Sequence, residues 1–317
     1  MVNDIIVSDG DVTVPTVLVD SNTSVHMNTN IIVRVPSIEG ISELDLAYNM
    51  CKFSDMSYSS PHRVPVHYES SFTFLSEDDA QCYIWKQGGT MVISFRGTES
   101  LIDVIADARI IQTELPLFES GSNETNPKVH CGFMSQFMSL KPKLDEEVLT
   151  FTKNPENSTR MIYFTGHSLG GGLATIAALH YSYKVSNPIS CTTFGSPRAG
   201  NNLFASLFNS KIKRSHRFVN QEDPIPFVPS DLFYEHVAGI RYIDRNGCIH
   251  DRITENRMLN FLKDCICCCL HTERPIHDHS CCDYLESIKR YKQQWDLKDS
   301  VDGTKRSGPG GGDTARV

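Results

Sequence analysis

The amino-acid sequence predicts an α/β protein with a mostly parallel central sheet flanked by helices. Between residues 160 and 220, short apolar and aromatic runs alternate with longer runs of helical periodicity. One of the apolar runs passes through a glycine-rich turn directly into an apolar helix, and more strands and helices follow in alternation. This alternation predicts a parallel sheet, because the connection between two parallel strands needs a crossover segment that covers the sheet.

A single domain accounts for most of the 317 residues, because a hydrophobic content of 40% can bury a substantial core and no break in composition divides the chain. We expect an extended segment over residues 1–40, where β-branched and polar residues alternate. The α/β domain then covers residues 41–295. Residues 296–317 are polar and rich in glycine near their end, so we expect a disordered tail there.

Charge and hydropathy exclude several classes of partner. The formal net charge of −8 argues against binding to nucleic acid, and an uncharged substrate suits it better. The sequence contains no apolar run that is long enough to span a bilayer. Its first residues have neither the basic region nor the continuous apolar region of a signal peptide. We therefore expect a cytoplasmic protein with no transmembrane segment and no nucleic-acid partner.

The eleven cysteines are too unevenly spaced for a disulfide framework. Six of them lie in one segment: Cys265, Cys267, Cys268, Cys269, Cys281 and Cys282. Unmodified thiols are the simplest interpretation. S-acylation of the first four, beside the apolar Ile266 and Leu270, is an alternative that would hold the protein peripherally at a membrane. A zinc site with His271 or His277 is a weaker one, because paired Cys-x-x-Cys motifs are missing. We expect no metal and no cofactor.

The first part of the domain is expected to hold one helix and three strands. Apolar residues at positions 41, 44, 47, 48 and 51 follow helical spacing. Turn residues at Asp78-Asp79 and Gly88-Gly89 then separate three extended runs, which are residues 72–75, 82–85 and 91–95.

The connection after the third strand is unusually apolar, with Leu101, Ile102, Val104 and Ile105. A lid that covers an active site in water and moves aside at a lipid surface needs such a face. A turn of helix packed into the core fits the same residues, so both interpretations stay open.

The most informative stretch is Gly-His-Ser-Leu-Gly, centred on Ser168. Residues 160–164 are suited to a buried strand, and residues 169–181 form an apolar helix that starts immediately after the turn. In a Gly-x-Ser-x-Gly turn the serine is lifted above the sheet, and the glycines Gly166 and Gly170 let the strand and the helix approach closely. A glycine-rich turn without chemistry would fit the bare motif, but the strand-turn-helix context favours a nucleophile.

The rest of the domain continues the alternation. We expect helices over residues 133–148, 202–208 and 284–295, strands over 189–194 and 216–220, and a hairpin around Asn246-Gly247. Asp223 follows the second of these strands, which is where the acid of a catalytic triad belongs. The neighbouring Glu222 is better explained as a solvated loop acid.

An acyl-transfer site also needs donors for the developing oxyanion, one from the residue after the nucleophile and one from a loop after an earlier strand. Leu169 and Thr98 fit these two positions. Taken alone, the Arg-Gly-Thr sequence before Glu99 would be an ordinary turn at the end of a strand.

Five stretches, in this order, resemble the class 3 lipase family of fungal-type lipases, which has the α/β-hydrolase fold. They are residues 94–100 (Ser-Phe-Arg-Gly-Thr-Glu-Ser), 129–133 (Val-His-Cys-Gly-Phe), 165–171 (Thr-Gly-His-Ser-Leu-Gly-Gly), 193–201 (Thr-Phe-Gly-Ser-Pro-Arg-Ala-Gly-Asn) and 218–226 (Phe-Val-Asn-Gln-Glu-Asp-Pro-Ile-Pro). The resemblance covers roughly residues 41 to 293. Secreted fungal members have a signal peptide and disulfides, so this chain looks more like the intracellular or viral-type members.

The resemblance implies a triad of Ser168, Asp223 and His279, with Thr98 and Leu169 at the oxyanion hole. Asp278-His279-Ser280 looks like the family's Asp-His motif, which precedes a terminal helix. The order serine, acid, histidine is also met by four other histidines, namely His236, His250, His271 and His277.

The implied function is a serine hydrolase that cleaves carboxylic esters of lipids, such as triacylglycerols or related acylglycerols and phospholipids, at a lipid-water interface. The alternative is a lipase-fold interaction protein that no longer catalyses. Acyl-chain and head-group preference are open at this stage.

Overall fold

The computed structural model describes residues 25–27, 41–61, 71–98, 111–118, 124–221, 223–253 and 278–302. At residues 25–27, 71 and 296–302 only the backbone is described. Several residues discussed above lie outside these ranges, namely the apolar connection at 101–107, Glu222, the cysteines from 265 to 269, His271 and His277. The interpretations offered for them stay predictions.

Nine of the described strands form one sheet, in the order β1-β2-β3-β4-β7-β8-β9-β10-β11. Its five central strands, β4, β7, β8, β9 and β10, run parallel, whereas β1 to β4 and the pair β10 and β11 are antiparallel. The bounds are β1 Val25–Met27, β2 Ser71–Glu77, β3 Ala80–Gln87, β4 Thr90–Phe95, β7 Ile162–His167, β8 Ile189–Phe194, β9 Arg214–Asn220, β10 Ile240–Ile243 and β11 Ile249–His250. The predicted α/β architecture with a parallel central sheet is confirmed.

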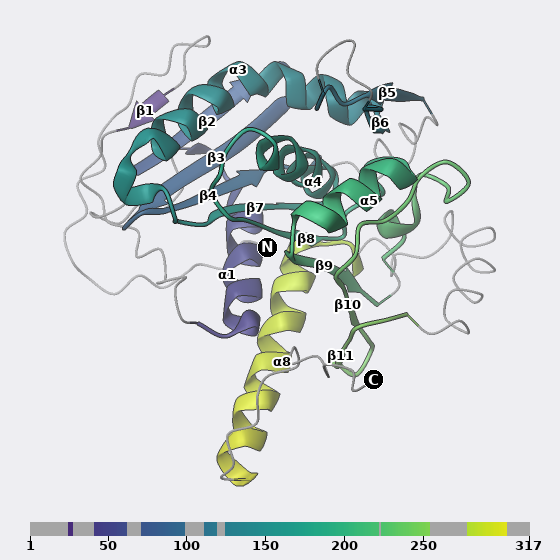
Figure 1. The fold of residues 1–317 in the computed structure, drawn as a ribbon. Coiled ribbons are helices and arrows are strands. Elements are labelled where there is room, and N and C mark those ends of the chain that lie inside the picture. The colour runs from purple at the N-terminus through teal and green to yellow at the C-terminus, as the bar shows by residue number, and fades with distance from the viewer. Residues whose placement is uncertain are drawn as a thin grey trace, which may run out of the picture.

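Helices cover both faces of this sheet (Figure 1). The first face is covered by α3 Cys131–Lys153, α4 Leu169–Ser182 and α5 Asn202–Lys211, and the second by α1 Glu43–Met56 and α8 Cys281–Asp302. Shorter described elements are the 3-10 helices η2 Pro155–Asn157 and η3 Ile225–Phe227 and a two-stranded sheet of β5 Gln112–Glu114 and β6 Lys128–His130. None of the helices in the described ranges is long and apolar enough to cross a membrane.

The two faces of the sheet bury separate hydrophobic clusters because side chains alternate along each strand. In β3, Cys82 and Ile84 point into the cluster under α3, α4 and α5, while Tyr83 and Trp85 point into the one under α1 and α8. Helix α4 lies deepest, because every residue from Gly170 to Tyr181 is buried. A helix that is apolar all round belongs in such a position.

Several element bounds differ from the sequence-based expectation. Helix α3 begins at Cys131, two residues early, because the His130 side chain caps it by accepting from the Phe133 N–H at 3.4 Å. Helix α8 continues through Asp302, so residues 296–302 are helical where a disordered tail was expected. The expected hairpin is present, with Tyr242 opposite His250 across β10 and β11.

Candidate active site

Ser168 lies at a strained turn between β7 and α4. Its φ of 58° and ψ of −131° fall in a region that residues other than glycine rarely adopt. The turn is held from both sides, since the Ser168 N–H donates to the Phe194 carbonyl at 2.9 Å and the Gly171 N–H donates to the Ser168 carbonyl at 2.9 Å. The strain therefore persists because the surrounding strand and helix over-determine the backbone.

Two glycines make this close turn sterically feasible. A Cβ at Gly166 would lie 2.3 Å from the Gly170 carbonyl, and a Cβ at Gly170 would lie 2.2 Å from the Phe95 carbonyl oxygen. Neither position can take a side chain without moving backbone. The prediction that these glycines allow strand and helix to approach closely is confirmed.

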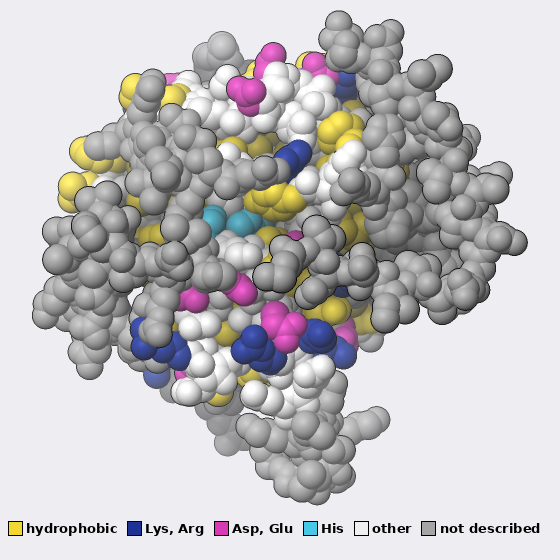
Figure 2. All heavy atoms as spheres, turned by 180° about the vertical axis from the view of Figure 1, so that it is seen from behind, with side chains coloured by type: hydrophobic (Ala, Val, Ile, Leu, Met, Phe, Trp, Pro, Cys, Tyr) yellow, Lys and Arg dark blue, Asp and Glu magenta, His cyan; other side chains and the backbone are white. Residues whose placement is uncertain are grey.

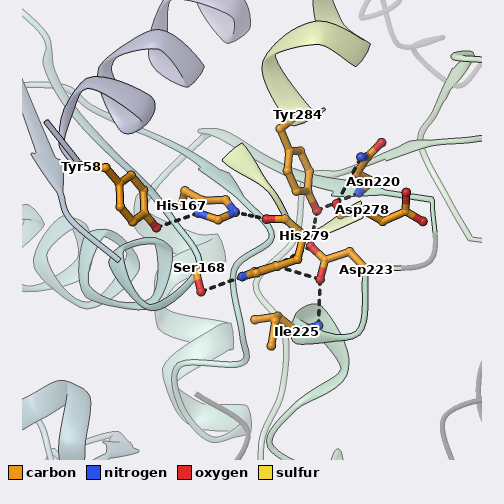
Figure 3. Close-up of polar contacts among 9 residues, drawn as sticks. All are labelled: Tyr58, His167, Ser168, Asn220, Asp223, Ile225, Asp278, His279 and Tyr284. Atoms are coloured by element: carbon orange, nitrogen blue, oxygen red, sulfur yellow. Dashed lines mark hydrogen bonds and ion pairs between the residues drawn. The ribbon is translucent and has the colours of Figure 1, made fainter. Parts of the chain in front are cut away.

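The structure brings the three residues of the predicted triad together (Figure 3). His279 Nε2 lies 2.8 Å from Ser168 Oγ, and His279 Nδ1 lies 2.9 Å from each carboxylate oxygen of Asp223. A carboxylate only accepts, so Nδ1 carries the proton and Nε2 is free to accept from the serine hydroxyl. The three residues are buried, with His279 the most exposed at 7%.

The other described histidines that follow Asp223 contact different groups. His236 donates from Nε2 to the Pro226 carbonyl, and burial, followed by the charge of Arg217, holds its pKa well below the usual value. His250 Nε2 lies 3.1 Å from Asp244 Oδ2. Each is thus engaged away from Ser168, as the choice of His279 requires.

Asp223 is held by donors from both the loop after it and the last helix. The Ile225 N–H donates to Oδ1 at 2.9 Å, and the Tyr284 hydroxyl donates to Oδ2 at 2.6 Å. Tyr284 in turn accepts from the Asn220 N–H at 2.8 Å. Burial, and then the Asp223 charge, raise the pKa of Tyr284 well above its usual value, so the phenol stays a donor. These donors fix the position of the Asp223 carboxylate beside His279.

The two expected oxyanion positions flank Ser168. Leu169 is the first residue of α4, so its N–H belongs to the helix turn that has no intrahelical acceptor. Thr98 follows Gly97, whose Cβ, if present, would lie 3.2 Å from the Ser168 Cβ. The turn after β4 and the N-terminus of α4 therefore meet at the serine, where the helix dipole favours negative charge.

Comparisons with known proteins show which sequences and folds this chain is similar to. The family model described as lipase (class 3) matches residues 92–233. Over this segment the chain is similar to the class 3 lipase family. This match spans Thr98, Ser168, Leu169 and Asp223 but ends before His279, so the place of the histidine rests on the structure.

Two curated proteins are similar in sequence. A chloroplastic phospholipase A(1) of Arabidopsis thaliana is 32% identical, over 44% of this chain and 33% of that protein. A secreted mono- and diacylglycerol lipase of Malassezia restricta is 29% identical, over 50% of this chain and 54% of that protein. The chain thus spans between a third and about half of the length of these two relatives.

Solved lipase structures share the fold. The triacylglyceride lipase of Rhizomucor miehei has 24% identity and a TM-score of 0.56, over 69% of this chain and 88% of that one. A triacylglycerol lipase whose catalytic centre is described as a serine protease triad has 25% identity and a TM-score of 0.55, over 69% of this chain and 89% of that one. The α/β-hydrolase fold of these lipases is therefore the fold of this chain.

Sequence reasoning missed two polar residues at the site, Tyr284 and His167. Tyr284 was expected only as the start of a helix, and His167 only as the variable position of the serine motif. Their hydrogen bonds join segments that are far apart in the chain, and local periodicity carries no signal for such contacts.

Proposed function

We propose that this protein is a serine hydrolase that cleaves carboxylic esters of lipids through an acyl-enzyme on Ser168. The observation that carries the proposal is the position of His279, whose two ring nitrogens lie 2.8 Å from Ser168 Oγ and 2.9 Å from the Asp223 carboxylate. This is the arrangement that a nucleophile, its general base and an orienting acid require.

We assign each residue a role that this geometry supports. His279 Nε2 takes the proton from Ser168 Oγ as the oxygen attacks the ester carbonyl, and the same nitrogen then gives that proton to the leaving alcohol. Asp223 holds the imidazole and stabilises its cationic form. Water attacks the acyl-enzyme in the second half of the cycle, and His279 again moves the proton. We assign the oxyanion to the Leu169 N–H and to Thr98.

Acylglycerols and phospholipids are the substrate classes we favour. The names of similar proteins include mono- and diacylglycerol lipases and phospholipase A(1), which all cleave lipid esters. The sequence is acidic overall, with a net charge of −8, which suits a neutral or zwitterionic lipid better than an anionic one. In Figure 2, histidine atoms (cyan) and hydrophobic side chains (yellow) lie next to each other on one face.

We also propose contact with a lipid surface through an apolar patch of Ile111, Leu232 and Phe233. Their exposed fractions are 59%, 80% and 55%. Two hydrogen bonds hold the patch together, from Gln112 Nε2 to the Phe233 carbonyl at 2.7 Å and from the Tyr234 hydroxyl to the Ile111 carbonyl at 3.3 Å. Exposed large apolar groups that are close together favour an interface over water.

Flotation with phosphatidylcholine vesicles tests this patch. The double variant Leu232→Ser, Phe233→Ser should bind the vesicles less than the unmodified protein does. Leu149→Ser, at an exposed leucine of α3, should not. Equal vesicle binding by all three proteins would contradict the contact.

The alternative is an interaction protein with the lipase fold and no catalysis. Loss of a triad member would favour it, whereas Ser168, Asp223 and His279 are present and hydrogen-bonded. Labelling with a fluorophosphonate probe, together with p-nitrophenyl butyrate turnover, separates the two proposals. The unmodified protein should label and turn over, while His279→Ala should lose almost all of both.

The matched control for this test is His250→Ala, a half-exposed histidine that also follows Asp223 in the chain. It should retain labelling and turnover. Circular dichroism checks that all variants fold. An unmodified protein that is folded but neither labels nor hydrolyses any acylglycerol, phospholipid or p-nitrophenyl ester would favour the interaction protein.

A further inference from the structure

His167, the residue before the nucleophile, lies between Tyr58 and His279 (Figure 3). It is 4% exposed. Its Nδ1 lies 2.8 Å from the Tyr58 hydroxyl, and its Nε2 lies 2.5 Å from the main-chain carbonyl oxygen of His279. Its ring centroid is 4.6 Å from that of His279. The mechanism proposed above uses none of these contacts.

Only one assignment of donors and acceptors fits the two hydrogen bonds of a neutral His167. A carbonyl oxygen can only accept, so Nε2 must carry the proton and donate to His279. Nδ1 then has a lone pair and accepts from the Tyr58 hydroxyl. Burial, and then the nearby His279, hold the pKa of His167 well below its usual value, which keeps the ring neutral. A neutral ring adds no positive charge beside His279 when that imidazole becomes a cation.

We propose that His167, fixed by Tyr58, is a positioning residue that holds the main chain of His279 so that its imidazole stays between Ser168 and Asp223. This inference rests on the proposed function. It concerns the backbone of the histidine, whereas Asp223 and Ser168 contact only its ring. His167 is covalently next to the nucleophile, so the same turn sets the place of the serine and the place of its base.

A second contact fixes the neighbouring carbonyl in the same way. Asn220 Nδ2 donates to the Asp278 carbonyl at 3.2 Å. Two successive carbonyls, those of Asp278 and His279, are thus held by side chains from β9 and β7. Misplacement of a reacting group by about 1 Å can cost on the order of 100-fold in rate, so anchors on the backbone of a general base affect the rate.

The Tyr58 hydroxyl also connects His167 with the turn after β4, which carries the expected oxyanion residue Thr98. A Cβ at Gly97 would lie 2.2 Å from the Tyr58 hydroxyl oxygen and 2.6 Å from the His167 carbonyl oxygen. The hydroxyl that fixes His167 therefore lies against the turn that carries Thr98. The contacts join the segment after α1, the turn after β4, the serine turn and the segment just before α8.

Turnover of p-nitrophenyl butyrate by four variants tests the proposal. His167→Phe keeps a ring but loses both hydrogen bonds, and should lower kcat by about 10- to 100-fold with KM changed less than about twofold. His167→Gln, whose amide can donate to the His279 carbonyl, should recover part of this loss. Tyr58→Phe removes a single hydroxyl and should lower kcat by about threefold to tenfold.

The fourth variant, His180→Phe, is the matched control. His180 is also a buried histidine, at 2% exposed, and lies at the other end of α4 with no hydrogen bond to either ring nitrogen among the described residues. It should leave kcat within about twofold. The proposal is overturned if His167→Phe keeps the unmodified kcat, or if His167→Gln is no better than His167→Phe. If His167→Phe does not fold, an unchanged kcat in Tyr58→Phe overturns it.

Nuclear magnetic resonance tests the positioning role of His167 independently of ester hydrolysis. The Nδ1 proton of His279, donated to Asp223, should exchange faster with water in His167→Phe and Tyr58→Phe than in the unmodified protein or His180→Phe. This readout needs no turnover. A protein that hydrolyses no ester but shows these differences would lose the proposed function and keep the positioning role, while equal exchange in all the proteins would overturn the positioning role.

Discussion

The Tyr284 hydroxyl donates a hydrogen bond of 2.6 Å to Oδ2 of Asp223 from the first turn of α8. His279, which precedes that helix, donates to the same carboxylate at 2.9 Å. One segment of chain therefore supplies both the base and a donor that orients the acid. The phenol also helps to hold the Asp223 carboxylate in place beside His279.

Tyr284→Phe should lower kcat by about tenfold, because Asp223 loses a donor and holds His279 less firmly. It should also lower the free energy of unfolding by about 1–3 kcal/mol, since the Asn220 N–H loses its acceptor. The control is Tyr181→Phe, which removes a hydrogen bond of the same type, to Asp145 Oδ1 at 3.0 Å. That variant should lose stability but keep kcat. Equal kcat values for the two variants would contradict the prediction.

Gly195→Ala should abolish most activity, because a Cβ there would lie 2.6 Å from Asp223 Oδ2 and 3.0 Å from His279 Nδ1. We expect a loss of at least about 100-fold in kcat. Gly88→Ala is the control for backbone strain, since its φ of 53° is close to the 57° of Gly195 and a Cβ at Gly88 meets nothing within 4 Å. Both should lose about 1–2 kcal/mol of stability from the left-handed conformation.

Urea unfolding and p-nitrophenyl butyrate turnover measure these two effects separately. A Gly195→Ala protein that is destabilised no more than Gly88→Ala and keeps its kcat would show that the contact with the Asp223 and His279 side chains is relieved without consequence. The prediction would then be wrong.

The strands could be predicted from sequence where turn residues bound them. Strand β8 was expected at residues 189–194 and found at Ile189–Phe194, because Pro188 and Gly195 delimit its apolar run. The serine turn was equally predictable, since glycines at fixed spacing are a steric requirement of that turn. Local sequence thus contains the information for elements whose limits are set by local backbone geometry.

The polar contacts around the triad could not be predicted in this way. The Tyr284 and Asp223 pair and the His167 and His279 pair are 61 and 112 residues apart in the chain. Such contacts depend on how β7, β9 and α8 are placed in space. The N-terminus of α3 was misplaced for a different, local reason, because His130 is an unusual cap and the preferred capping residues are absent there.

Ser168→Gly should be more stable than Ser168→Ala, although both should be inactive. Both remove the hydroxyl that contacts His279, but only glycine relieves a φ of 58°. Strain at such a residue costs about 1–3 kcal/mol, and the greater freedom of glycine in the unfolded chain offsets about 0.4–1 kcal/mol of the gain. We expect a net difference of about 1 kcal/mol in urea unfolding. An alanine variant as stable as the glycine variant would mean that the turn is unstrained.

Acid should destabilise the fold through His180, a buried histidine in α4 whose ring nitrogens have no hydrogen-bond partner among the described residues. Burial, and then the charge of Lys141, lower its pKa from 6.5 to about 4. Between these two values the unfolded chain binds a proton that the folded protein does not. The contribution of neutral His180 to the free energy of unfolding is therefore fully present above pH 6.5. It falls as the pH drops toward 4 and falls no further below that.

The size of the His180 effect follows from the pKa difference, which corresponds to roughly 3 kcal/mol across the window. Urea unfolding of the unmodified protein and of His180→Phe at several pH values from 7 to 4 measures it. Other groups contribute to the slope as well, since burial also lowers the pKa of His167 and His236. His180→Phe removes only the contribution of His180 to this pH dependence, so the free energy of unfolding of that variant should fall less steeply between pH 7 and 4. Parallel curves for the two proteins would show that His180 titrates alike in the folded and unfolded states, which a buried ring without hydrogen bonds should not do.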